Sequence, residues 1–93
     1  MKLVYVDEAI EDLKCLREFI ALHNPLAATR IAIELVGKIE LLPSFPKIGT
    51  PVEIAPVPDS VRDMVFGKYV VRYSVHTSTI IILRIWHGLE GER

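Results

Sequence analysis

The spacing of apolar residues in the first quarter of the chain predicts a short strand and then an amphipathic helix. Residues 2–6 read Lys-Leu-Val-Tyr-Val, a composition typical of a strand. The helix is expected from Asp7 to about His23, with Asp7 as its N-cap and with acidic residues near its positive end: Glu8, Glu11 and Asp12. Its apolar residues recur every three or four positions and therefore share one face, with Phe19 at the edge: Ala9, Leu13, Leu16 and Ile20.

A second amphipathic helix is expected to follow directly and to form a hairpin with the first. Asn24 can cap it, and Pro25 suits its first position, where the missing N–H is not needed. We interpret the charged row on one side of this helix as a solvated face: Arg30, Glu34 and Lys38. The stripe expected to pack on the core is Ala28, Ile31, Leu35, Ile39 and Leu42.

The segment after the second helix is expected to be a loop. It is interrupted by residues that break helices: Pro43, Pro46, Gly49 and Pro51. Phe45 and Ile48 are expected to fix this loop to the core, and residues 55–60 to form an extended connection. No repeat or linker interrupts the chain, so residues 1–93 are expected to form a single domain.

The C-terminal third predicts three antiparallel strands, at residues 61–66, 69–75 and 80–88, with a turn at Gly67-Lys68 and a corner at His87-Gly88. Strict alternation in the middle strand separates an apolar face (Tyr69, Val71, Tyr73 and Val75) from a mixed one (Val70, Arg72, Ser74 and His76). The expected fold class is α+β, with an N-terminal strand, a helical hairpin and a twisted antiparallel sheet of three to four strands.

The last strand predicts a surface that needs a partner. Ile80, Ile81, Ile82 and Leu83 are apolar at consecutive positions, so both faces of the strand need cover, whereas two helices cover only one. A partner protein, a second copy of the chain, or a loop or the C-terminal tail could cover the other face. Alternation does not decide whether Ile80 and Ile82 or Ile81 and Leu83 face the helices. With Ile82 taken as the outward position, a charge there is expected to weaken partner binding and to leave the fold largely intact.

Composition supports an apolar partner surface and argues against several functions. Hydrophobic residues make up 51% of the 93, with a mean hydropathy of +0.33, more than a small domain readily buries. The net charge of −1 disfavours general nucleic-acid binding outside a target complex. No apolar run is long enough to span a membrane and no signal peptide is recognisable, so a cytosolic location is expected.

No cofactor or metal is expected from the sequence. The histidines lie on different predicted elements without metal-ligand spacing: His23, His76 and His87. Glycines do not form a phosphate-binding motif. Cys15 is the single cysteine, which excludes an internal disulfide, and we expect it in the core or at its boundary.

The strands of residues 61–88 ending at His87-Gly88, the two helices before them, Asn24-Pro25 and Phe45-Pro46 together resemble the RelE/ParE superfamily of bacterial toxins, in its ParE-like branch. The resemblance covers nearly the whole chain. It implies a type II toxin that is neutralised by a cognate antitoxin, whose segment could lie across the second face of the sheet. It further implies inhibition of DNA gyrase by binding its cleaved-DNA state, with a toxin that forms oligomers with its antitoxin.

The superfamily also contains RelE-type ribonucleases, which cut messenger RNA on the ribosome with a cluster of basic residues. Their pattern has Arg after the Tyr of the penultimate strand and another Arg near the chain end, whereas Val70 follows Tyr69 here and Gly88-Leu89-Glu90 follows His87. If the chain is such a nuclease, its candidate catalytic residues are Arg62, Arg72, Arg84 and His87. A third alternative is an inactive module that only binds partners.

The predicted partner-binding residues combine these cations with apolar neighbours: Arg62, Lys68, Arg72, Ile80, Ile82, Arg84, Trp86 and His87. Four of them have a structural alternative. Arg62 and Arg84 could pair with Asp63, Glu53 or the acidic tail. Trp86 could belong to the core, and His87 could be a structural residue without a catalytic role.

Overall fold

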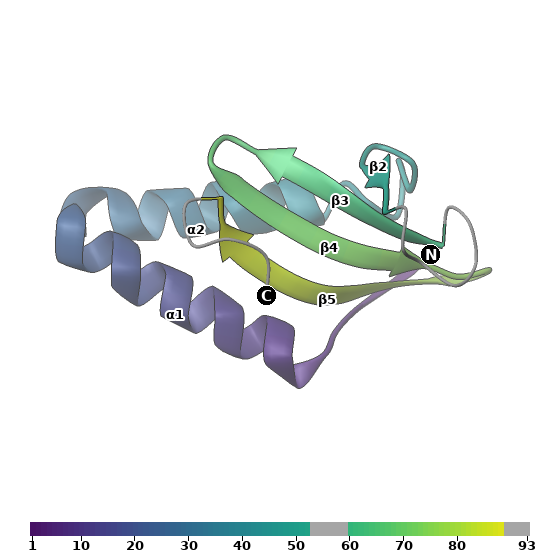
Figure 1. Cartoon of the computed structure of the whole chain (residues 1–93), viewed down its shortest axis with the longest axis horizontal. Coiled ribbons are helices and arrows are strands. Elements are labelled where there is room, and N and C mark those ends of the chain that lie inside the picture. The colour runs from purple at the N-terminus through teal and green to yellow at the C-terminus, as the bar shows by residue number, and fades with distance from the viewer. Residues whose placement is uncertain (53–59, 89–93) are drawn as a thin grey trace.

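The computed structural model describes residues 1–52 and 60–88, which form a sheet covered on one side by two helices (Figure 1). Glu53 and the tail from Leu89 onward, named above as possible ion-pair partners or cover, lie outside the described residues. In chain order the elements are β1 (Lys2–Tyr5), α1 (Asp7–His23), α2 (Pro25–Ile39), β2 (Thr50–Pro51), β3 (Val61–Phe66), β4 (Tyr69–Val75) and β5 (Thr79–His87).

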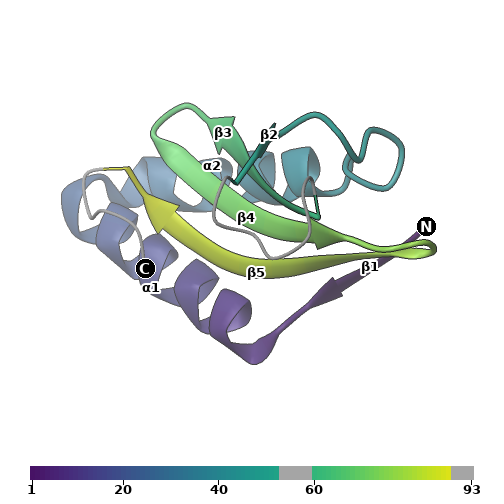
Figure 2. The ribbon, with the colours of Figure 1, turned by 45° about the vertical axis from the view of Figure 1, so that its right-hand side comes forward.

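The sheet has five strands in the order β1-β5-β4-β3-β2. The strands β3, β4 and β5 are antiparallel as predicted, but β1 lies parallel to β5, with Lys2 opposite Thr79 (Figure 2). The helical hairpin carries the chain away from β1 before the meander begins, so β1 becomes an edge strand beside the last strand. The expected loop contributes the short β2, with Thr50 opposite Asp63. The α+β fold class is confirmed, with one more strand and a mixed sheet.

Both helices begin and pack largely as their apolar spacing predicts. Most of the predicted stripes lie in the core, with Leu13 and Ile31 partly buried against it. The Asn24 side chain caps α2 by accepting a hydrogen bond from the Ala27 N–H at 3.2 Å. The prediction that Asp7 caps α1 is wrong, because Val6 is the N-cap residue and no side chain caps that end. The N–H of Val6 still donates to Ile82 in the sheet, so the chain passes directly from strand to helix.

The last strand settles which isoleucines face the helices. Ile80 and Ile82 are 0% exposed and belong to the core, whereas Ile81 lies on the opposite face. Arg72 pairs with Arg84 and Tyr73 with Ile82, which leaves Leu83 as an extra residue. This bulge lets Ile85 return to the core face. The assignment of Ile82 as an outward position is therefore wrong, and so is the placement of Ile80 and Ile82 on a partner surface.

Two further burial predictions are wrong. Cys15 is exposed because it lies on the flank of α1 away from the stripe of Ala9, Leu16 and Ile20. Phe45 and Ile48 are 58% and 53% exposed and do not fix the loop to the core.

The loop is held instead by polar groups of the sheet. The Tyr73 hydroxyl donates to the Pro46 carbonyl at 2.8 Å and accepts from the Gly49 N–H at 3.0 Å. The buried Arg62 guanidinium donates to the Gly49 carbonyl at 2.6 Å. Since the Gly49 backbone is the shared partner, the approach of the loop to the sheet depends on this residue.

Gly49→Ala is expected to destabilise the protein. A Cβ at this position would lie 2.7 Å from the Asp63 carbonyl oxygen and 2.9 Å from the Tyr73 hydroxyl, so the loop would have to move away from β3. Overpacking of this kind typically costs about 1–3 kcal/mol. Urea unfolding followed by circular dichroism measures the change. Gly37→Ala is the matched control, because nothing lies within 4 Å of its added Cβ; equal midpoints for the wild type and Gly49→Ala would contradict the expected clash.

Stability is expected to fall at alkaline pH, in part through Tyr73. Burial raises the pKa of Tyr73 above its usual 10.0 and Asp63 adds to the rise, although the bond from Gly49 and the charge of Arg62 oppose it. The folded protein therefore keeps this proton where the unfolded chain loses it, so the stabilisation is complete below pH 10 and is lost as the pH rises through the folded pKa.

Tyr73→Phe tests this pH dependence. The variant should lose less unfolding free energy above pH 10 than the wild type. Some loss should remain, because burial also raises the pKa values of Tyr5 and Tyr69. Urea titrations at pH 8, 10 and 11 give the slopes. Equal slopes for the variant and the wild type would show that ionisation of Tyr73 does not contribute to the alkaline loss of stability.

Candidate functional site

Arg72, Asp63 and Trp86 form a cluster on the sheet face opposite the helices. Asp63 on β3 lies directly across from Arg72 on β4, and their side chains form two hydrogen bonds, Nε to Oδ1 at 2.9 Å and Nη2 to Oδ2 at 3.0 Å. The same guanidinium lies 5.2 Å from the ring centroid of Trp86 on β5, a favourable cation–π distance. Trp86 is only 5% exposed. The cluster thus combines polar and aromatic groups, and the Asp63 carboxylate neutralises the charge of Arg72.

Arg84 is tied to the first helix. Its guanidinium donates to both carboxylate oxygens of Asp12, Nε to Oδ2 at 2.8 Å and Nη2 to Oδ1 at 3.0 Å. Asp12 also accepts the backbone N–H of Ile85 at 2.9 Å and is 3% exposed. These hydrogen bonds raise the pKa of Arg84 above its usual range, so the group stays charged.

Asp12 has a role that the sequence does not predict: the expectation is only that it lies near the positive end of the helix, whereas its carboxylate binds β5. β1 ends at Tyr5, so the edge of β5 beyond Ile82 faces α1 in place of a strand. Asp12 supplies the acceptor that a neighbouring strand would otherwise provide to Ile85. The sequence contains one indication of this role, because Asp12 lies three residues after Ala9 and four before Leu16 and therefore inside the buried stripe.

The other predicted cations do not join this face. Arg62 lies on the helix-covered face, in register with Tyr73 and Ile82, and binds the loop at Gly49. Lys68 is exposed in the turn between β3 and β4, and its carbonyl accepts the Gly88 N–H.

His87 is buried among aromatic rings on the helix side. Its ring centroid lies 5.2 Å from that of Tyr69 and 5.8 Å from that of Phe19 on α1. This environment matches the structural alternative for His87 better than a role as an exposed acid or base.

The four candidate nuclease residues are therefore not brought together. Arg72 and Arg84 lie across from each other on neighbouring strands, but each is bound to its own carboxylate. Arg62 and His87 lie on the helix side. Cleavage of a phosphodiester needs cationic donors aimed at one developing charge. The open face carries paired charges and partly exposed apolar residues, and it presents no convergent set of cationic donors among the described residues.

Residues 1–52 and 60–88 contain neither a metal-binding cluster nor a membrane-spanning helix. No three His, Cys, Asp or Glu side chains there lie close enough to hold a metal ion. None of the helices in those ranges has the length and apolarity to cross a membrane.

Comparison with known proteins gives consistent matches across nearly the whole chain. The family model for the ParE toxin of the type II toxin–antitoxin system parDE matches residues 3–91. Toxin RelE2 of Caulobacter vibrioides is 32% identical over 88 residues, covering 94% of each chain. A solved structure of the chromosomal ParDE system of P. aeruginosa superimposes with a TM-score of 0.79 at 23% identity, covering 94% of this chain and 95% of that one. The RelB–RelE complex of Methanococcus jannaschii gives a TM-score of 0.57 at 19% identity over 94% and 92%.

The family-model match and the curated relative place the chain in the RelE/ParE superfamily of type II toxins, and the two solved structures share its fold. Within it, the chain belongs to the ParE toxin family, whose model spans all of its helices and strands except the first residue of β1.

Proposed function

We propose that this toxin acts by binding DNA gyrase and stabilising its cleaved-DNA state, without chemistry of its own. The observation that carries this proposal is the separation of the four candidate nuclease residues onto two sides of the sheet, with Arg72 and Arg84 each neutralised by a carboxylate. A binding inhibitor needs a stable surface and no convergent catalytic groups. Gyrase is proposed as the target because the chain belongs to the ParE family, whose resemblance implies that target.

The second component of the proposal is a cognate antitoxin. The structural neighbours are described as a ParDE system and a RelB–RelE antitoxin–toxin complex. On this chain the open face of the sheet is the proposed antitoxin surface, because Val4 on β1 is 37% exposed and Ile81 beside it is only partly buried. Ile81 replaces Ile82 as the position where a charge should weaken antitoxin binding while the fold is retained.

The gyrase proposal is tested with purified gyrase in supercoiling and DNA-cleavage assays. The toxin is titrated with and without its antitoxin, and circular dichroism confirms that the sample is folded. Inhibition with accumulated cleaved DNA, reversed by antitoxin, supports the proposal. A folded sample without effect at micromolar concentrations contradicts it.

Ribosome-dependent cleavage of messenger RNA is the second candidate. It is supported by one observation, the direct cross-strand placement of Arg72 and Arg84 on β4 and β5. Mapping of transcript ends after induction distinguishes the two functions: cuts in phase with codons support the nuclease, whereas intact transcripts with DNA-damage signalling support gyrase. Harmless expression without antitoxin would instead indicate an inactive binding module.

A further inference from the structure

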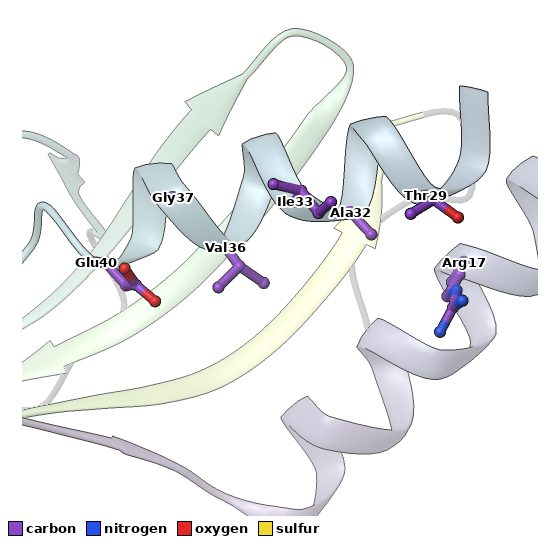
Figure 3. A pocket seen from close by; sticks show the side chains of 7 residues that line it. All are labelled: Arg17, Thr29, Ala32, Ile33, Val36, Gly37 and Glu40. Carbon is purple, nitrogen blue, oxygen red and sulfur yellow. The ribbon is translucent and has the colours of Figure 1, made fainter. Parts of the chain in front are cut away.

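The outward side of α2 carries an apolar groove that the proposed function does not use (Figure 3). Its volume is about 440 Å³, and it is lined by Arg17 from α1 and by six residues of α2 and its C-cap: Thr29, Ala32, Ile33, Val36, Gly37 and Glu40. Ile33 is 66% exposed, and Leu26, one turn before Thr29 and Arg30, is 94% exposed. Large apolar side chains this exposed in one row indicate a surface that is covered in an assembly.

The lining of α2 is symmetric along the helix. The lining positions lie at equal distances on either side of the point midway between residues 34 and 35. Ile33 corresponds to Val36, Ala32 to Gly37, and Thr29 to Glu40. A second α2 that packs antiparallel on the first would therefore place each member of a pair against its counterpart. The small residues Ala32 and Gly37 would meet at the contact and allow the helix axes to approach closely. Nothing lies within 4 Å of a Cβ built at Gly37, so this space is open.

The charges at the two ends of the groove favour the same arrangement. Arg17 lies near the Thr29 end and Glu40 at the other end, too far apart along the helix to pair within one chain (Figure 3). Neither forms an ion pair with another residue of the described ranges. An antiparallel two-fold axis through the groove brings the partner's Glu40 to Arg17 and, by symmetry, Arg17 to the partner's Glu40. The surface is thus complementary to itself in both shape and charge.

We propose that the antitoxin-free toxin forms a two-fold symmetric dimer through this groove, with the two α2 helices antiparallel. The proposal does not depend on the gyrase target, because no step of its test needs gyrase. The contact involves essentially one helix and one arginine from each copy, which places it among small, weak interfaces. A dissociation constant on the order of 10 μM is expected.

Sedimentation velocity on the purified toxin at concentrations from about 1 to 500 μM tests the dimer directly. Ile33→Asp should raise the dissociation constant by about 100-fold or more, because each new carboxylate would be buried against the partner's Val36 without a counter-ion. Val65→Asp is the matched control, since Val65 is exposed to nearly the same extent, 68%, but lies on β3 away from the groove. The control should dimerise like the wild type.

A charge exchange tests the orientation of the helices. Arg17→Glu and Glu40→Arg should each weaken self-association, whereas an equimolar mixture of the two variants should form a mixed dimer in which both end pairs are attractive. Glu34→Arg is the control for net charge, because Glu34 does not line the groove and instead lines a separate hollow beside Phe66 of β3. Failure of the mixture to associate while the wild type does would overturn the antiparallel arrangement.

Two outcomes would overturn the dimer itself. One is a wild-type toxin that stays monomeric at all concentrations. The other is self-association that Ile33→Asp leaves unchanged while the same variant binds its antitoxin less tightly, which would assign the groove to the antitoxin. Both outcomes leave the gyrase proposal standing, so failure of the two proposals can be distinguished.

Discussion

Ile82→Asp is expected to prevent the toxin from folding. The Ile82 side chain is 0% exposed, lies opposite Tyr73 on β4 and Tyr5 on β1, and belongs to the core between sheet and helices. Loss of a buried isoleucine costs about 2–5 kcal/mol, and an unpaired buried carboxylate adds several more. Together they reach the total stability of about 5–15 kcal/mol that is typical of small domains.

Circular dichroism and thermal unfolding of the purified variant measure this effect. The matched control is Ile81→Asp, which changes the neighbouring residue of the same strand on the opposite face. Ile81 is partly exposed beside Val4 and Ser74, so its variant should unfold cooperatively with a modest loss of stability. A cooperative melt of Ile82→Asp near the wild-type temperature would contradict the assignment of the core face.

The same strand shows where sequence patterns stop being informative. The helix stripes and the faces of β4 could be predicted because polar residues alternate with apolar ones there. In β5, Ile80 to Leu83 are all apolar, so the sequence does not indicate which of them face the core. The bulge at Leu83 then reverses which alternate residues of β5 face the core. The bulge itself arises from the register between β4 and β5. The local sequence does not determine this pairing between distant segments.

The candidate site was predictable as a set of residues but not as an arrangement. Arg62, Arg72 and Arg84 all stand in strands and look equivalent in the sequence. Their roles differ because their partners come from distant segments: Gly49 in the loop, Asp63 on the next strand, and Asp12, which is 72 residues away from Arg84. A charged residue inside a buried stripe indicates that a partner exists, but it does not say which one.

Asp12→Ala is expected to cause the second large loss of stability. The carboxylate closes the edge of the sheet where β1 ends, accepting from the Arg84 guanidinium and from the Ile85 N–H. Without it, the buried N–H of Ile85 has lost its acceptor, which alone costs about 1–3 kcal/mol. The lost charge-assisted bonds add to this, so the melting temperature should fall by about 10 °C or more.

Conservative changes distinguish the edge-capping role of Asp12 from a simple ion pair. Asp12→Asn keeps an oxygen that can accept from Ile85 but loses the charge, so its stability should lie between those of Asp12→Ala and the wild type. Arg84→Met removes the guanidinium and leaves the Ile85 bond intact, so it should be milder than Asp12→Ala. The double variant should lose less stability than the sum of the two single changes, because they share one network. Hydrogen exchange at the Ile85 amide adds a local measurement: protection should be lost in Asp12→Ala and retained in Arg84→Met. Equal protection in the two variants would show that α1 closes the sheet edge without this carboxylate.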